Sequence, residues 1–159
     1  MTMRLDDGLV DFLRRPLMCI IAATGADGRP SAGRGIGVDV LADRETIDVM
    51  FSGWQWPRLE TAIRETGRLA ATFVSPSDYV TFQIKGAAAM RATEAGDLDR
   101  ADRFMAAATG ELESLGVSPR IIVPWLTARD ARVARLGAGE IYVQTPGPQA
   151  GMSAAAWGR

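Results

Sequence analysis

Apolar residues recur along the chain with two different periods, and the period changes from one segment to the next. In residues 31–41 apolar side chains alternate with small or polar ones, which is the spacing of a strand with one buried face. In residues 95–116 they recur every three or four positions, which is the spacing of an amphipathic helix. Turn residues such as Asp27-Gly28 separate the segments. The patterns predict strands over residues 16–24, 31–41, 46–52, 69–75, 79–92 and 131–145, helices over 5–15, 57–66 and 95–116, and a turn or two of helix over 118–127.

The order of these segments indicates the fold class. Most strands are joined by short turns, and the regular strand–helix alternation of a parallel sheet is missing, so we expect an antiparallel barrel with peripheral helices. A chain of 159 residues is expected to form one domain, with irregular tails at residues 1–8 and 146–159. Within the last strand we expect a Gly-rich bulge at 137–139. Asp97 is expected to cap the helix over 95–116.

Charge and composition exclude several classes of protein. The 18 basic and 19 acidic residues form no block, so neither a nucleic-acid partner nor a membrane surface is indicated. The N-terminus is too polar for a signal peptide and no apolar run approaches a membrane span, so a cytoplasmic location is expected. The chain has no histidine, which removes the usual general base, metal ligand and haem ligand. Cys19 is the only cysteine, so no disulfide within the chain and no metal site is expected.

The segment FSGWQWPR, residues 51–58, holds the first candidate chemistry. A strand that ends at Ser52-Gly53 and leads into a helix near residue 57 leaves free amide groups at the start of that helix, and such a helix end attracts anions. Arg58 adds a full positive charge there, and Ser52 can donate a hydroxyl hydrogen bond, so a phosphate fits this arrangement. The alternative is structural: Trp54 and Trp56 are core or interface rings, and Arg58 pairs with an acidic neighbour, Glu60 or Asp48.

Two other patterns also have both a functional and a structural interpretation. Glycines at 33, 35 and 37 lie on one face of a strand, where they leave a smooth strip for another strand, a helix or a flat ring system. The structural alternative is a bulge or close packing. Gln83 and Lys85 lie on the side of their strand that faces away from the core, and such groups can bind the carbonyls of a ring ligand or simply face solvent.

The order of these features resembles a known family. The sequence has a strand, DGRP, a long strand, a strand ending in Phe-Ser, a short helix opening with Arg, then GRLAATFVSP and VTFQIKGAA. This arrangement, over roughly residues 9–145, resembles the pyridoxamine 5'-phosphate oxidase-like family of FMN-binding split barrels. The resemblance implies an antiparallel split β-barrel of about six strands, mainly β in the α+β class, with two FMN sites between the subunits of a homodimer.

The resemblance also assigns roles to individual residues. It places Phe51 and Ser52 beside the flavin and Arg58 on the FMN phosphate, although the lysine that often follows this arginine is Leu59 here. Arg34 is the nearest match to a second phosphate-binding residue, and Gln83 is expected to line the flavin of the partner chain. With the candidates taken from the residues themselves, the expected cofactor-binding set is Arg34, Phe51, Ser52, Gly53, Trp56, Arg58, Gln83 and Lys85.

These expectations lead to a first functional hypothesis, an FMN-dependent oxidoreductase that acts on a small organic molecule. Trp54, Trp56 and Trp157 are expected to wall its pocket. The histidines and the arginine-rich last strand with which the vitamin-processing oxidases hold pyridoxal phosphate have no counterpart, so that substrate is not expected. Two alternatives remain: a deazaflavin-dependent reductase on the same fold, and a flavin-binding protein without catalysis.

Overall fold

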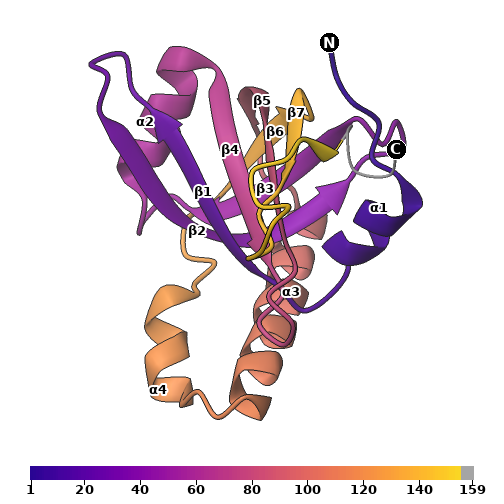
Figure 1. Ribbon diagram of the computed structural model, residues 1–159. Coiled ribbons are helices and arrows are strands. Elements are labelled where there is room, and N and C mark those ends of the chain that lie inside the picture. The colour runs from indigo at the N-terminus through magenta and orange to yellow at the C-terminus, as the bar shows by residue number, and fades with distance from the viewer. Residues whose placement is uncertain (155–159) are drawn as a thin grey trace.

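The computed structural model describes residues 1–154, which form a barrel with helices around it (Figure 1). Six antiparallel strands pair in the order β4-β1-β2-β3-β6-β5, and β4 pairs with β5 to close the ring. A seventh strand, β7, pairs with β5 outside this ring. The expected antiparallel split barrel of about six strands with peripheral helices is therefore confirmed. The strands are β1 Met18–Thr24, β2 Pro30–Val40, β3 Thr46–Ser52, β4 Arg68–Val74, β5 Thr81–Arg91, β6 Ala131–Gly137 and β7 Glu140–Val143.

Two short helices pack against the barrel. In α1 (Asp7–Leu13), the ring of Phe12 meets the ring of Phe82 edge to face, with centroids 5.0 Å apart. Helix α2 (Pro57–Thr66) starts with a proline and ends at Gly67, whose φ of 63° is the left-handed conformation that terminates helices. The bounds predicted for α2 from these two signals are correct.

A longer helix leaves the barrel and returns to it. Helix α3 (Ala95–Ser114) packs against β2, with Ala101 fully buried at the contact. Figure 1 shows the far half of α3 extending beyond the barrel to α4 (Pro119–Ile122). A 3-10 turn, η1 (Val123–Trp125), then leads the chain back toward β6. Together α4 and η1 are the turn or two of helix expected over residues 118–127.

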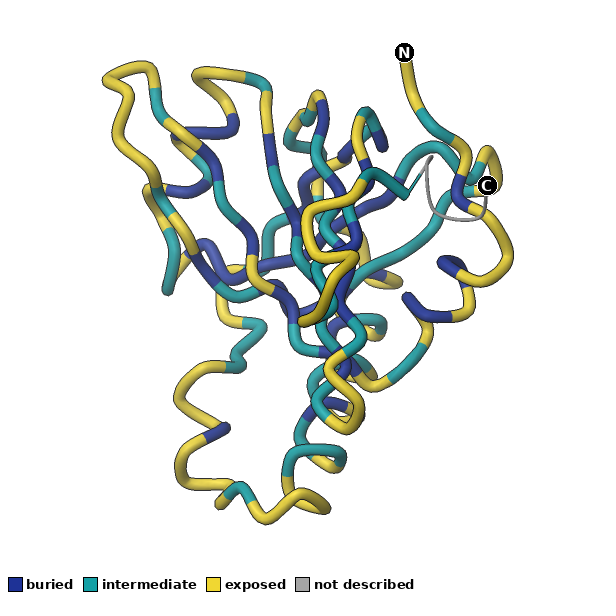
Figure 2. Tube along the Cα trace, viewed as in Figure 1, coloured by how far each residue is buried: buried dark blue, intermediate teal, exposed yellow. Residues whose placement is uncertain are grey.

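The interior of the barrel is filled by inward-facing side chains from its strands. Figure 2 shows that the buried positions concentrate in the strands and on the barrel side of the helices. Each large apolar side chain enclosed in this way contributes about 1.5–3 kcal/mol to folding. Members of this core that are fully enclosed include Leu17, Ile21, Phe51, Phe73 and Ile84.

An ionic cluster fastens the start of α3 to the barrel. The guanidinium of Arg91 donates hydrogen bonds to Asp48 on β3 and to Asp97 in α3, at 2.7–2.9 Å, and Arg135 donates two more to Asp48. Burial works to raise the pKa of Asp48, but the bonds from Arg135 and Arg91 outweigh it and hold that pKa below its usual value. The same Arg91 lowers the pKa of Asp97. Both carboxylates therefore stay charged although they are almost wholly buried.

Two details of the sequence prediction are wrong. Asp97 is not the N-cap of α3: Glu94 is, and Asp97 at the third position accepts a hydrogen bond from the Glu94 amide in a capping box. The single strand expected over 131–145 is two strands, because the chain changes partner at residues 137–139. Strand β6 pairs with β3 and the far end of β5, whereas β7 pairs with the near end of β5.

Candidate functional site

The junction between β3 and α2 is held by a compact set of hydrogen bonds. The Ser52 hydroxyl donates to the carbonyl of Arg129 at 2.7 Å and accepts from the amide of Gln55 at 3.2 Å. The amide of Gly53 donates to the carbonyl of Asp130 at 2.8 Å. A Cβ at residue 53 would lie 2.8 Å from the Asp130 carboxylate, so packing alone accounts for this glycine.

The strand end itself is buried. Phe51 and Ser52 are fully enclosed, with no exposed surface, and Gly53 is buried. Their side chains therefore support the loop that follows and do not line an open surface in this structure. Among the residues that follow, Trp54, Pro57 and Arg58 are exposed, and Gln55 and Trp56 are half-buried.

The strip of glycines on β2 is filled by the protein itself. A Cβ at Gly33 would lie 2.6 Å from the ring of Trp56, and one at Gly35 would lie 2.5 Å from the sulfur of Cys19. A Cβ at Gly37 would lie 2.5 Å from the sulfur of Met50. Side chains and α3 already occupy this strip, and the strand register shifts between Gly35 and Gly37, so the structural alternative, a bulge with close packing, holds.

Arg58 is the second residue of α2, and it is exposed. Within residues 1–154 it forms no ion pair and no side-chain hydrogen bond. The structural alternative for this residue is wrong, since Glu60 pairs with Arg64 and Arg132, and Asp48 belongs to the ionic cluster. No side chain caps the start of α2 either. Pro57 has no N–H and the Leu59 amide donates to the Trp56 carbonyl, so an unpaired cation lies at a helix start whose remaining amide is that of Arg58.

A hollow of about 310 Å³ adjoins this charge, between the β1–β2 hairpin and α2. Arg58 and Arg29 line it together with the hydroxyl-bearing residues Ser31 and Thr61. Two acidic residues also line it, but each has a partner: Asp27 lies 3.8 Å from Arg29, and Glu65 accepts the amide of Ala26. Among the described residues neither Arg58 nor Glu65 forms an ion pair, and Arg58 also forms no side-chain hydrogen bond. We call this hollow the α2 hollow.

Arg34 and three tryptophans meet on the other side of the junction. A cleft of about 430 Å³ is lined by Trp54, Gln55, Trp56, Pro124 and Trp125, and we call it the tryptophan cleft. The guanidinium carbon of Arg34 lies 5.5 Å from the centre of the Trp125 ring, and that of Arg129 lies 4.3 Å from the centre of the Trp54 ring. Gln55 Nε2 donates to the carbonyl of Pro124 at 2.8 Å and ties η1 to the junction. Trp157 lies outside the described residues.

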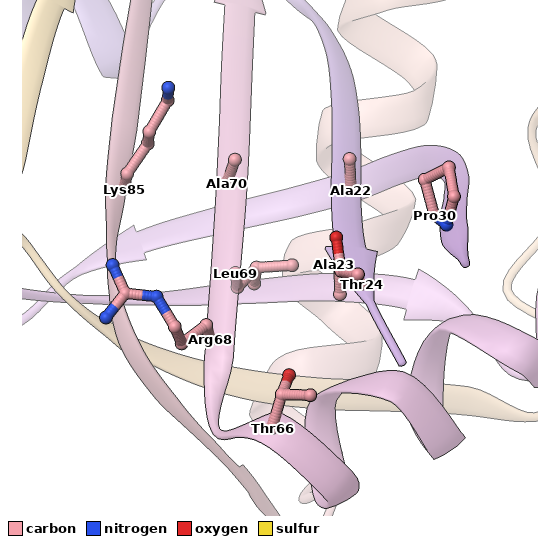
Figure 3. Close-up of a pocket in the computed structure, with 9 residues that line it drawn as sticks. All are labelled: Ala22, Ala23, Thr24, Pro30, Thr66, Arg68, Leu69, Ala70 and Lys85. Atoms are coloured by element: carbon pink, nitrogen blue, oxygen red, sulfur yellow. The ribbon is translucent and has the colours of Figure 1, made fainter. Parts of the chain in front are cut away.

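Gln83 and Lys85 lie elsewhere, on the outer face of β5. Gln83 Nε2 donates to Thr72 Oγ1 at 2.9 Å, and Lys85 Nζ lies 5.1 Å from the centre of the Tyr142 ring. Lys85 also borders a shallow groove of about 380 Å³ whose floor includes Ala22 and Ala70 (Figure 3). Strand register separates Gln83 from Arg34 by three strand intervals, about 14 Å along the sheet at about 4.8 Å each.

The structure thus gathers only part of the predicted set. Ser52, Gly53, Trp56 and Arg58 meet at one junction, with Arg34 reaching it through Trp125, while the two β5 residues lie apart. Sequence reasoning missed Gln55 and Arg129 as parts of this region, and it left Trp125 without a role. Gln55 lies within the quoted WQW run, but only the return of the chain through η1 brings the other two to it. In the described part of the chain no helix could span a membrane, and no acidic, Cys or His residues are grouped as metal ligands.

The closed ring of six antiparallel strands with an extra strand and peripheral helices is the split-barrel fold of the pyridoxamine 5'-phosphate oxidase-like proteins. Among solved structures, HupZ from Group A Streptococcus aligns with a TM-score of 0.56 and 17% identity, over 92% of this chain and 99% of that chain. The heme storage protein HutZ from Vibrio cholerae gives 0.51 and 15%, over 89% and 95%. A pyridoxamine 5'-phosphate oxidase-related, FMN-binding protein from Nostoc punctiforme gives 0.52 and 12%, over 91% and 87%. Neither family models nor curated proteins match the sequence.

Proposed function

We propose that this protein is an FMN-dependent oxidoreductase that acts on a small organic molecule. The observation that carries the proposal is the unpaired, exposed Arg58 at the uncapped start of α2, beside the α2 hollow. The fold by itself selects no cofactor, because its solved examples include both a heme storage protein and an FMN-binding protein. The chain has no histidine for a haem iron, whereas a phosphate group matches the donors that are present.

In this proposal the residues of the α2 hollow hold the FMN phosphate. The Arg58 guanidinium offers paired N–H donors to phosphate oxygens. The backbone amide of Arg58 lies in the first turn of α2, where Pro57 has no N–H and the Leu59 amide donates to the Trp56 carbonyl. Arg29, which lies 3.8 Å from Asp27, lines the same hollow, and Ser31 adds a hydroxyl donor. Arg34 lies beyond the junction, next to the tryptophan cleft, where it contributes positive potential to the same region. Bound FMN would supply hydride chemistry at its N5 atom.

A second copy of the chain completes the proposed site. Gln83 and Lys85 are about 14 Å along the sheet from Arg34 within one chain, so they serve a flavin held near the junction best from a partner subunit. In the row of Lys85 the outer face carries the small side chains of Ala70 and Ala22, which allow a close approach. A C2 homodimer would bring each such face to the other chain.

Proton handling in this proposal falls to groups other than imidazole. Tyr142 lies beside Lys85 on the outer face, and its hydroxyl donates a hydrogen bond to the Glu140 carboxylate. That hydrogen bond, together with the charge of Glu140, raises the pKa of Tyr142. The phenol is therefore a weaker acid than a free tyrosine, and in this proposal it donates to a substrate only by exchanging its hydrogen bond with Glu140.

A titration with FMN tests the phosphate site. Loss of a charge-assisted arginine–phosphate contact costs about 1.5–3 kcal/mol, so Arg58→Ala is expected to weaken FMN binding about 10- to 100-fold. Arg58→Lys should recover part of the loss, since a point charge replaces a fork. Arg64→Ala is the matched control on the same helix, because Arg64 bonds only to Glu60 among the described residues and Glu60 keeps Arg132 as a partner.

The readout is the quenching of flavin fluorescence, together with the visible spectrum of the purified protein. Flavin bands and an affinity that depends on Arg58 support the proposal. Equal FMN affinity in the parent and in Arg58→Ala would contradict the assignment of the phosphate site. A deazaflavin spectrum would identify the alternative reductase, and a protein that stays colourless with added FMN would contradict flavin chemistry altogether.

A further inference from the structure

Two of the large aromatic side chains that line the tryptophan cleft are exposed to solvent, as is typical of a binding surface. The side chains of Trp54 and Trp125 are 54% and 47% exposed, although large aromatic rings release the most free energy when they are buried. Single exposed apolar residues are normal on a protein surface, but here three indole rings face one hollow of about 430 Å³. That volume lies within the range of about 300–1,000 Å³ that is typical of small-molecule sites.

The charge around this cleft is positive and has no acidic partner. Arg129 stacks on Trp54 at 4.3 Å, and Arg34 lies over Trp125 at 5.5 Å. Neither guanidinium forms an ion pair with an acidic residue anywhere in residues 1–154. A ring placed against either tryptophan lies within about a Debye length, about 8 Å, of a guanidinium. An anionic group on that ring would be attracted, and a planar carboxylate matches the arginine fork.

Two polar atoms of the lining residues also lack partners. Gln55 uses its Nε2 to hold the Pro124 carbonyl, which leaves its Oε1 buried without a hydrogen bond. Trp56 Nε1 is buried in the same way. Native proteins leave few buried polar groups without a hydrogen bond. Both atoms belong to residues that line the cleft, and within the described residues neither has a hydrogen-bond partner.

We propose that the tryptophan cleft binds a planar aromatic carboxylate of one or two rings. The rings stack on the indoles, and the carboxylate lies toward Arg34 and Arg129. Its role as the substrate site rests on the proposed flavin function, while the binding itself requires no flavin. The site is distinct from the α2 hollow, because the two share no lining residue.

Isothermal titration calorimetry of the purified protein with 2-naphthoate tests the cleft, and 2-naphthalenemethanol is the neutral counterpart. We expect naphthoate to bind at least about 10-fold more tightly than the alcohol, which corresponds to about 1.4 kcal/mol. The reason is that its charged group loses water when it contacts the guanidinium groups in the cleft. Arg129→Gln and Trp125→Ala should each weaken naphthoate binding about 10-fold. Arg120→Gln is the control, because Arg120 is an exposed arginine on α4 that neither lines the cleft nor stacks on its rings.

Two results would overturn the proposal. One is equal affinity for naphthoate and the alcohol, or an affinity that Arg129→Gln and Trp125→Ala leave unchanged. The other is displacement of naphthoate by FMN in competition, which would make the cleft part of the flavin site. Binding that depends on the arginines and persists in saturating FMN supports the proposal. The FMN titration of Arg58→Ala is separate, so a failure of the flavin hypothesis is distinguishable from a failure of the cleft.

Discussion

Replacement of Asp48 by asparagine is expected to loosen the ionic cluster that fastens α3 to the barrel. Asp48 is 2% exposed and accepts four hydrogen bonds from Arg91 and Arg135 at 2.8–2.9 Å. Asparagine has nearly the same shape, so no cavity forms. It removes the negative charge, however, and turns one acceptor into a donor that faces guanidinium groups.

The size of this effect follows from the exposure of the two arginines. Breaking a buried ion pair by removing one partner costs about 3–5 kcal/mol. The Arg91 and Arg135 side chains are 22% and 47% exposed, so water can solvate part of the charge that is released. We therefore expect a loss near the lower limit, about 3 kcal/mol, in the free energy of unfolding. For a domain of this size that corresponds to a fall in Tm of about 6–12 °C.

Urea unfolding followed by tryptophan fluorescence measures this loss. Asp11→Asn is the control, because Asp11 pairs with Arg14 at 3.5 Å with both side chains 75% exposed, and a change under about 0.5 kcal/mol is expected. If Asp48→Asn shifts the urea midpoint no more than Asp11→Asn does, the cluster does not stabilise the fold and the argument from burial is wrong.

Three other outcomes are expected. Hydrogen bonds from Arg15 lower the pKa of Asp78 to about 2, so its pKa in the folded protein lies below that in the unfolded chain. The contribution of this carboxylate to the free energy of unfolding is therefore complete above about pH 4 and is lost as the pH falls toward 2. Urea midpoints measured across the acid range would show the loss. Gly86→Ala would place a Cβ 1.9 Å from a carbonyl oxygen of β6, so we expect insoluble protein or a loss of more than about 4 kcal/mol by urea unfolding, whereas an unchanged midpoint would contradict the close approach. Burial raises the pKa of the Cys19 thiol, so iodoacetamide should label Cys19 in urea but not in the native protein, as mass spectrometry would report.

Local signals in the sequence were sufficient where a segment is defined by its own residues. Strand β3 and helix α2 have the predicted bounds, because alternation and the Pro57 and Gly67 signals act within a few positions. The division between β6 and β7 could not be predicted in this way. It depends on Gly86 in β5, where the carbonyl of Gly137 approaches closely, and that contact joins residues about fifty positions apart.

The same limit applies to the candidate site. The position of Arg58 at a helix start follows from its neighbours in the sequence. Its lack of a partner depends on distant residues, because Arg132 and Arg135 in β6 form ion pairs with Glu60 and Asp48. The glycines of β2 suggested an open strip because nothing local shows that Trp56 and Met50 fill it. The tryptophan cleft required η1 to return to the junction, and no periodic pattern encodes that return.

Closure of the barrel by β6 has a consequence for the order in which the protein can fold. Strand β3 pairs with β6 across an interval that contains α2, β4, β5 and α3, so this pairing waits until nearly the whole chain has left the ribosome. Until then, one edge of β3 and part of one edge of β5 have unpaired backbone groups, which invite pairing with other chains. A chain truncated before residue 131 would keep both edges unpaired permanently, so the last fifth of the chain protects the rest of the molecule against aggregation.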